Sequence, residues 1–166
     1  MKNLIIAIGF LLISCNTNIN KSVDEIWKEG QQHRIANNLK EAISSFKSII
    51  NKFPKHELSA KAQFQIADIF LNDEKNYDYA IKEFKLVVKN YPNHDDAKKS
   101  LFMIAYIYNN YINAYSDAIL HYHLFKEKYP NDELIPSVEY ELNGLKNVQS
   151  TIDSLNLEVK ENIGIR

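Results

Sequence analysis

Few residues of this chain have the type and spacing that chemistry requires. Cys15 is the only cysteine, so it has no partner for a disulfide bond within the chain. His121 and His123 stand two residues apart, which on a helix directs their side chains to different faces, so we expect no shared metal ion. The sequence contains neither the Gly-x-Ser-x-Gly turn of hydrolases nor a His-Glu-x-x-His zinc helix. These observations predict a protein without enzymatic activity, cofactor or metal.

The overall composition narrows the possible partners. The chain has 20 basic and 21 acidic residues and a net charge of −1, so electrostatics do not favour binding to nucleic acid. Its glycines are too far apart for a phosphate-binding loop, which excludes nucleotide binding of that kind. A hydrophobic content of 45% with 25% charged residues is typical of a folded globular domain.

The first residues have the pattern of an export signal. Lys2 precedes an apolar run from Leu4 to Ile13. At about 1.5 Å per residue this run covers about half of a bilayer core of roughly 30 Å, so we expect no spanning helix. Residues 1–14 are therefore interpreted as a signal peptide that is removed.

The residues Leu12-Ile13-Ser14-Cys15 resemble the lipobox of bacterial lipoproteins, in which the cysteine is linked to diacylglycerol and becomes the first mature residue. The resemblance implies that Cys15 is lipidated and that residues 15–22 tether the protein to a membrane, because two or more acyl chains give stable anchoring. Asn16 favours the outer membrane if the enteric sorting rule applies. An ordinary signal peptide with an incidental cysteine is the alternative.

A regular repeat organises the rest of the chain, with the same step from position 42 to 80 and from 80 to 118. An alanine followed four residues later by an aromatic residue recurs three times, and each unit ends at an aromatic residue followed by proline. The first set is Ala42 with Phe46, Ala80 with Phe84, and Ala118 with Tyr122; the second is Phe53-Pro54, Tyr91-Pro92 and Tyr129-Pro130. His56 and His94 lie one repeat apart in equivalent linkers and are interpreted as loop residues.

The other half of each unit keeps the same step. Phe64-x-Ile66-Ala67 aligns with Phe102-x-Ile104-Ala105, and the spacing fits one face of a helix. We therefore expect a helix A at 57–71 and at 95–109, and a helix B at 77–90 and at 116–128. Asn76 and Ser116 are the expected N-caps of the two B helices.

These units resemble the tetratricopeptide repeat, whose pattern includes a small residue in helix A and then Ala-x3-Phe and Pro. The matching residues of the first unit are Gly30, Ala42, Phe46 and Pro54. The small residue lies where helix A comes closest to helix B, so a larger side chain would overpack the contact. The unit is longer than the usual tetratricopeptide repeat by one residue in the turn between the helices and by three before the next helix A. We expect the three additional residues to lengthen helix A.

The lengthened unit is similar to repeats of bacterial envelope proteins, namely the lipoprotein partner of the β-barrel assembly machinery and the periplasmic repeat protein associated with the Tol-Pal system. The resemblance covers residues 22 to about 146 and predicts an all-α, right-handed tetratricopeptide-type superhelix. We expect three hairpins in residues 23–132. Residues 133–166 form a capping helix and tail, because their apolar residues continue at helical steps from Leu142 to Val159.

In the resembling repeats the A helices line a concave surface. Trp27, Phe64, Phe102 and Tyr140 occupy equivalent positions on four successive A helices. The resemblance implies an aromatic ladder that contacts a partner protein. Polar neighbours on the same face are Gln31, Arg34, Asp68 and Tyr106. Packing of the rings in the core is the alternative.

Together these features predict a lipid-anchored scaffold on the bacterial outer membrane, facing the periplasm. Its mechanism is binding alone: it holds an envelope protein or peptide segment during assembly of the envelope. The alternative is a carrier or sensor of a small envelope ligand such as a peptidoglycan fragment. That alternative requires an enclosed pocket, and three hairpins provide little curvature for one.

Overall fold

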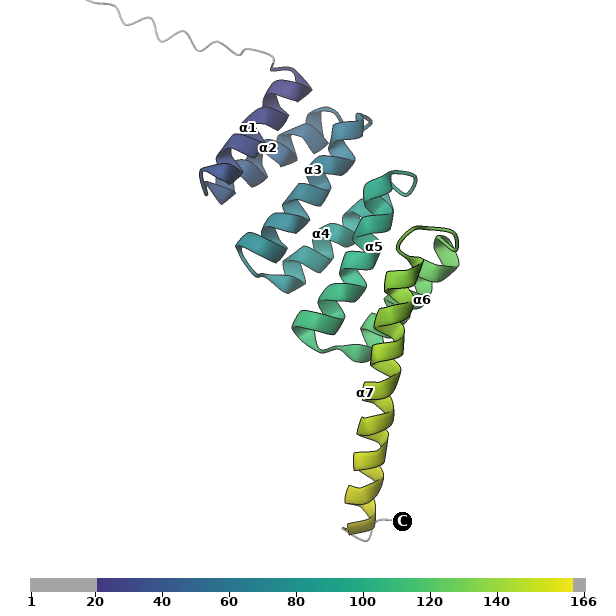
Figure 1. The fold of residues 1–166 in the computed structure, drawn as a ribbon. Coiled ribbons are helices and arrows are strands. Elements are labelled where there is room, and N and C mark those ends of the chain that lie inside the picture. The colour runs from purple at the N-terminus through teal and green to yellow at the C-terminus, as the bar shows by residue number, and fades with distance from the viewer. Residues whose placement is uncertain (1–20, 163–166) are drawn as a thin grey trace, which may run out of the picture.

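The structure, a computed structural model, describes residues 21–162 (Figure 1). The predicted signal peptide, residues 1–14, and the predicted lipidation site, Cys15, lie outside these residues. The described part is made of helices and contains no strand. Its elements are α1 (Val23–Ile35), α2 (Leu39–Lys52), α3 (Glu57–Asp68), η1 (Ile69–Asp73), α4 (Tyr77–Asn90), α5 (Asp95–Ile107), η2 (Tyr108–Ile112), α6 (Tyr115–Lys128) and α7 (Ile135–Asn162), where η marks a π-helical segment. This confirms the prediction of an all-α helical repeat superhelix.

The helices pair into three hairpins, α1 with α2, α3 with α4 and α5 with α6, and the hairpins stack with α2 against α3 and α4 against α5 (Figure 1). Three equivalent positions in the second helix of each hairpin are fully buried, because they recur on one helix face. These residues are Ala42, Phe46 and Ile49; Ala80, Phe84 and Val87; and Ala118, Tyr122 and Phe125. The repeat predicted from the sequence is therefore the unit of packing.

The predicted close approach between the two helices of a hairpin occurs at Gly30. A Cβ atom added there would lie 2.7 Å from Cε1 of Phe46, which is closer than nonbonded carbon atoms normally come. Because Phe46 is fully buried, its ring has little room to move. The second and third hairpins have alanine, Ala67 and Ala105, at the equivalent positions. The first hairpin therefore requires glycine where the others accept alanine.

The additional residue in the turn between the helices is accommodated as a π-helical segment. In the first hairpin the turn closes when the N–H of Asn38 donates to the carbonyl of His33 at 2.8 Å. In the second hairpin η1 widens this turn by one residue, and the N–H of Asn76 donates to the carbonyl of Phe70 at 2.7 Å. The third hairpin repeats this arrangement in η2. Both helical segments therefore run beyond their predicted ends at 71 and 109.

The starts of the second helices follow the sequence only in part. Asn76 is the N-cap of α4, as predicted, and its side chain accepts a hydrogen bond from the backbone of this helix. The prediction that Ser116 caps α6 is wrong, because α6 begins at Tyr115 after Ala114. Ala114 lies one repeat after Asn76, and its backbone has similar dihedral angles. The repeat geometry therefore determines where the helix starts even without a capping side chain.

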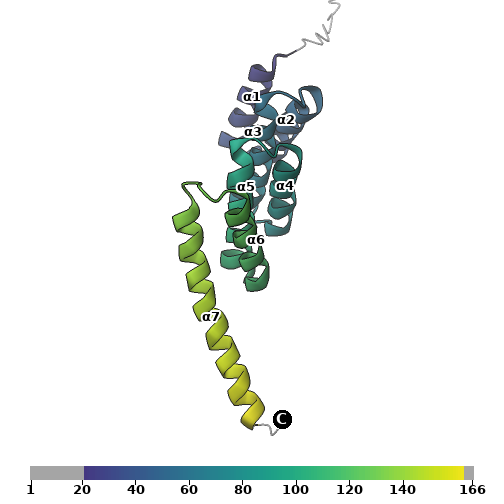
Figure 2. The ribbon, with the colours of Figure 1, turned by 90° about the vertical axis from the view of Figure 1, so that its right-hand side faces the viewer.

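The last helix, α7, caps the stack and then extends past it. Val138, Leu142 and Leu145 are buried in the cluster that includes residues of α6, whereas Val148 is 38% exposed. Figures 1 and 2 show the helix running well beyond the hairpins and at an angle to α5. Within residues 21–162, no helix combines the length and the apolar character needed to cross a bilayer.

The two glycines of the described helices allow a paired test of the close approach. We expect Gly30→Ala to destabilise the protein by up to about 2 kcal/mol, because overpacking costs roughly 1–3 kcal/mol against a helix-propensity gain of about 1 kcal/mol. Gly144→Ala is the control, since a Cβ added there would meet no described heavy atom within 4 Å other than its chain neighbours and the backbone of its own helix. It should stabilise the protein by about 1 kcal/mol. Urea unfolding measures both, and equal stabilisation by the two changes would contradict the proposed contact.

Candidate functional site

A groove runs between α3, α5 and the segment that leads into α7, and it is termed here the aromatic groove. Its volume is about 490 Å³, which falls within the usual range of roughly 300–1,000 Å³ for ligand-binding pockets. Its lining consists of four apolar residues, Phe64, Phe102, Met103 and Leu134, and five charged ones, Asp95, Lys98, Lys99, Asp132 and Glu133. The groove thus combines an apolar surface with charges of both signs.

Phe64 and Phe102, two of the four predicted ladder residues, line this groove together. Both are half-buried, and each packs edge-on against an aromatic ring of the second helix of its hairpin. The ring centroids are 5.2 Å apart for Phe64 and Phe84, and 5.8 Å apart for Phe102 and Tyr122. Each ring therefore belongs to the core on one side and lines the groove on the other. Core packing and groove lining are therefore roles of different sides of the same ring.

The other two ladder residues lie outside the aromatic groove. Trp27 is half-buried in the first hairpin, with its ring 5.3 Å from that of Phe46. Tyr140 is 79% exposed on α7. It is separated from Phe102 because α7 packs mainly against α6, and Figure 2 shows the start of α7 set apart from α5. The structure therefore brings two of the four rings into one groove.

Tyr140 borders a second groove, between η2 and α7, which is termed here the lower groove. Its volume is also about 490 Å³. The lining residues are Asn109, Tyr140, Glu141, Asn143, Gly144, Leu145, Asn147 and Val148. Nδ2 of Asn109 donates to Oε2 of Glu141 at 2.7 Å and so joins η2 to α7. The two grooves lie toward opposite ends of the seam between the third hairpin and α7.

Arg34 and Asp68, both predicted to contact a partner, bind each other between the first two hairpins. Nη2 of Arg34 lies 2.6 Å from Oδ2 of Asp68 and 2.8 Å from Oδ2 of Asp73. Nη1 of Arg34 also donates to Oε1 of Gln65 at 2.9 Å. These contacts satisfy most of the donors of the guanidinium group and hold the hairpins together. Their predicted role in partner binding stays a prediction.

Gln31 and Tyr106, the other predicted polar contacts, are half-buried. The ring of Tyr106 stacks on Phe102, with centroids 6.2 Å apart, and meets the edge of Tyr111 at 6.0 Å. Tyr111 in turn stacks on Tyr77 at 4.7 Å. A continuous row of rings therefore extends from the aromatic groove to the π-helical turn, which spacing alone did not predict.

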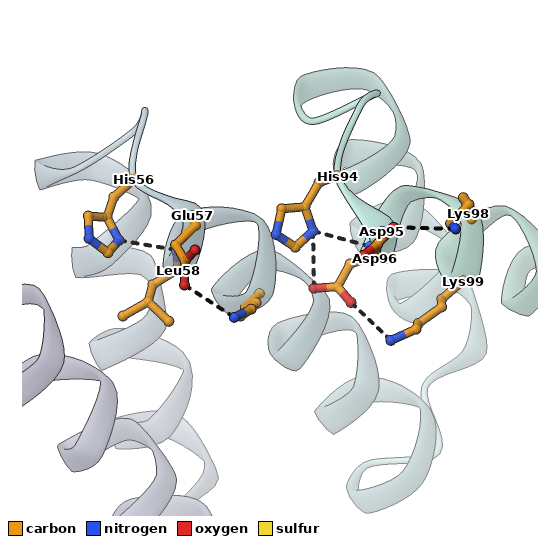
Figure 3. A network of polar contacts seen from close by, with 9 residues as sticks. His56, Glu57, Leu58, His94, Asp95, Asp96, Lys98 and Lys99 are labelled. Atoms are coloured by element: carbon orange, nitrogen blue, oxygen red, sulfur yellow. Dashed lines mark hydrogen bonds and ion pairs between the residues drawn. The ribbon is translucent and has the colours of Figure 1, made fainter.

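Three equivalent linker residues, His56, His94 and Asp132, cap the turns that follow them. Nδ1 of His56 accepts a hydrogen bond from the N–H of Leu58 at 3.2 Å, and Nδ1 of His94 accepts one from the N–H of Asp96 at 3.1 Å (Figure 3). Their recurrence in equivalent linkers had indicated only loop residues. The equal steps from His56 to His94 and from His94 to Asp132 are the signal that could have identified this capping position.

Asp132 joins the start of the last helix to α5. Its Oδ1 atom accepts a hydrogen bond from the N–H of Leu134 at 3.0 Å, and its Oδ2 atom lies 3.0 Å from Nζ of Lys98. The hydrogen bond from the backbone N–H of Leu134 lowers the pKa of Asp132 below its ordinary value, and the contact with Lys98 lowers it further. Hydrogen bonds to Asp132 and Asp95 raise the pKa of Lys98. Lys98 is thus engaged within the protein, and Lys99, 59% exposed, is more accessible to a ligand.

The two histidines of α6 have separate surroundings. Nδ1 of His121 lies 2.7 Å from the carbonyl oxygen of Asp117, whereas His123 is exposed. In the part of the chain that the structure describes, no group of three or more His, Cys, Asp or Glu side chains is placed to hold a metal ion.

The charge on Asp132 predicts a pH-dependent contribution to stability. Its pKa is lower in the folded than in the unfolded state, so it stabilises the fold above its ordinary pKa of 3.8, and this effect is lost at lower pH. Asp132→Asn keeps a capping acceptor but removes the charge. We expect it to lower the urea midpoint at pH 7 and to approach the parent chain near pH 3. Glu127→Gln, at an exposed residue of α6 away from Lys98, is the control and should leave the midpoint nearly unchanged. A difference for Asp132→Asn that is independent of pH would contradict this assignment.

Comparison with known proteins supports the assignment of tetratricopeptide repeats to part of the chain. The tetratricopeptide repeat family model matches residues 61–94 and 99–132, and the two matches begin one repeat apart. The match concerns the repeat and identifies neither of the envelope families named above. No curated protein matches the chain. The matched segments cover most of the second and third hairpins. Two units of this helical stack are therefore detected as tetratricopeptide repeats, a module that generally binds other proteins.

Proposed function

We propose that the protein is a lipid-anchored adaptor of the bacterial envelope that binds a segment of another protein in the aromatic groove. The observation that carries this proposal is that the groove brings Phe64 and Phe102, from consecutive hairpins, together with Met103 and Leu134. Aromatic and apolar side chains that are partly exposed above a packed core are typical anchors of protein interfaces, because they lose apolar exposed area when a partner binds.

Contacts within the protein hold the groove in shape before a partner arrives. Phe64 and Phe102 are each supported by a ring of the second helix. The ion pair between Lys98 and Asp132 fixes the segment that forms the far side of the groove. Such preorganisation favours binding, because less side-chain and loop freedom is lost when the complex forms.

The charges at the rim favour a polypeptide as the ligand. Asp95, Lys99 and Glu133 are exposed beside the apolar residues, so the groove has an apolar interior and a polar rim. Protein interfaces commonly have this organisation. An amphipathic segment can place apolar side chains on Phe64 and Phe102 while its own charges meet the rim.

The place of the protein in the envelope rests on its first residues. We infer that the apolar run before Cys15 directs export and that lipid on Cys15 anchors the protein to the outer membrane, facing the periplasm. The residues between Cys15 and α1 can span at most roughly 25 Å, at about 3.5 Å per residue. The tether therefore keeps the hairpins close to the bilayer, where a partner involved in envelope assembly would meet them. The resemblance of the lengthened repeat to those of envelope proteins supports this role.

Photo-crosslinking tests the aromatic groove directly. Replacement of Phe64 or Phe102 by a photoreactive phenylalanine analogue preserves most of the ring packing. Irradiation of living cells should give a discrete crosslinked protein from each position. Position 47, at an exposed lysine on the α2 surface, is the control and should give none. Identical crosslinks from all three positions, or none from 64 and 102, would contradict partner binding in this groove.

Substitution of the cysteine tests the anchor. Cys15→Ala is expected to abolish metabolic labelling with a fatty acid analogue and to move the protein from the membrane fraction to the soluble fraction, because no acyl chain remains to hold it. Ser14→Ala keeps a small residue before the cysteine and should remain labelled and membrane-bound. Persistent labelling of Cys15→Ala would rule out lipidation at this residue.

A further inference from the structure

The glycine at position 144 has no evident packing role within the protein. It lies inside α7, where glycine is less favourable than alanine by roughly 1 kcal/mol. It is exposed, and a Cβ added to it would meet no described heavy atom within 4 Å other than its chain neighbours and the backbone of its own helix. Gly30 differs, because Phe46 occupies the space beside it. The space at Gly144 therefore suits a molecule that approaches the backbone of α7 from outside.

An exposed aromatic ring lies one helical turn before this glycine. Tyr140 is 79% exposed, and Gly144 and Val148 follow it at four-residue intervals along one side of α7. All three line the lower groove. A bulky side chain at position 144 would stand between the ring and Val148. Its absence leaves a flat strip with an aromatic face at one end.

The remaining polar residues of the lower groove are mostly carboxamides. Asn109, Asn143 and Asn147 each offer a donor and an acceptor. Glu141 is the one charged residue in the lining, and its carboxylate accepts a hydrogen bond from Asn109. The groove therefore offers several neutral hydrogen-bonding groups beside an aromatic ring.

We propose that the lower groove binds a neutral saccharide. A sugar ring presents a C–H-rich face, which stacks on the face of an aromatic ring such as Tyr140. Its hydroxyl groups both donate and accept hydrogen bonds, as carboxamides do. The space above Gly144 lets a sugar ring lie close to the helix. This site is separate from the aromatic groove and adds a second binding activity to the proposed adaptor function.

The charges and amides of the groove argue against other ligands. An acidic ligand would meet Glu141, and no lysine or arginine in the lining offsets its charge. A cationic ligand would compete with Asn109 for that carboxylate. An apolar helix of a partner protein would cover the asparagine side chains without satisfying their hydrogen bonds, which is unfavourable. A neutral polyhydroxyl ligand avoids all three costs.

Isothermal titration calorimetry on the full chain tests the proposal, in a detergent that lacks a sugar headgroup. The probes are the tetramers of α1,4-linked glucose, β1,4-linked glucose and N-acetylglucosamine. At least one should bind, and both Tyr140→Ala and Gly144→Gln should weaken it tenfold or more. Lys146→Gln changes an exposed α7 residue outside the groove lining and should bind as the parent does.

The glycine variant separates loss of a site from loss of the fold. Gly144→Gln should raise the urea midpoint through helix propensity while it weakens saccharide binding, so the two measurements move in opposite directions. Photoreactive substitution at position 102 should leave saccharide binding unchanged, which keeps this proposal distinct from the adaptor function. Absence of binding by all three tetramers, or binding that is unaffected by both Tyr140→Ala and Gly144→Gln, would overturn the proposal.

Discussion

The distance between the two helices of each hairpin is limited where a small residue of the first helix meets an aromatic ring of the second. Gly30 leaves space for Phe46 in the first hairpin, and a single added carbon would overlap the ring. The pairs of Ala67 with Phe84 and of Ala105 with Tyr122 share buried clusters in the next two. Because Phe84 and Tyr122 are fixed in the core, they can support Phe64 and Phe102 on the side that faces away from the groove. The aromatic groove thus depends on this close contact, although none of the small residues lines it.

One position joins the first helix of each unit to the first helix of the next, with different chemistry each time. The successive pairs are Arg34 with Gln65, Leu71 with Met103 in a shared apolar cluster, and Asn109 with Glu141. The last pair is a single hydrogen bond, the ion pair between Lys98 and Asp132 adds a second polar link, and Leu101 of α5 shares a buried cluster with α7. The last helix packs mainly against α6, and both grooves lie along its looser boundary with the rest of the third hairpin.

Much of the fold could be predicted from the amino-acid pattern. The recurrence of alanine and an aromatic residue once in every repeat indicated the hairpins, and the buried second-helix residues lie where that pattern places them. The pattern also showed an additional residue in the turn, but its π-helical conformation depends on which carbonyl the widened turn can reach. The predicted cap at Ser116 failed for a related reason, since a preferred capping residue did not override the backbone geometry shared by the repeats.

The sequence by itself therefore determined the helical class, the period, the need for small residues and the faces turned toward the core, because these follow from local propensity and regular spacing. Only the tertiary structure decided which surface residues remain accessible. From the sequence, Arg34 and Asp68 were expected on an exposed polar face of the A helices. In the structure they form an ion pair across the boundary between the first two hairpins. Tyr140 holds the fourth ladder position in the sequence, yet α7 packs mainly against α6 and Tyr140 lines a separate groove. Such outcomes depend on the relative positions of helices that are distant in the sequence, as Arg34 and Gln65 are, and periodicity within one helix carries no information about them.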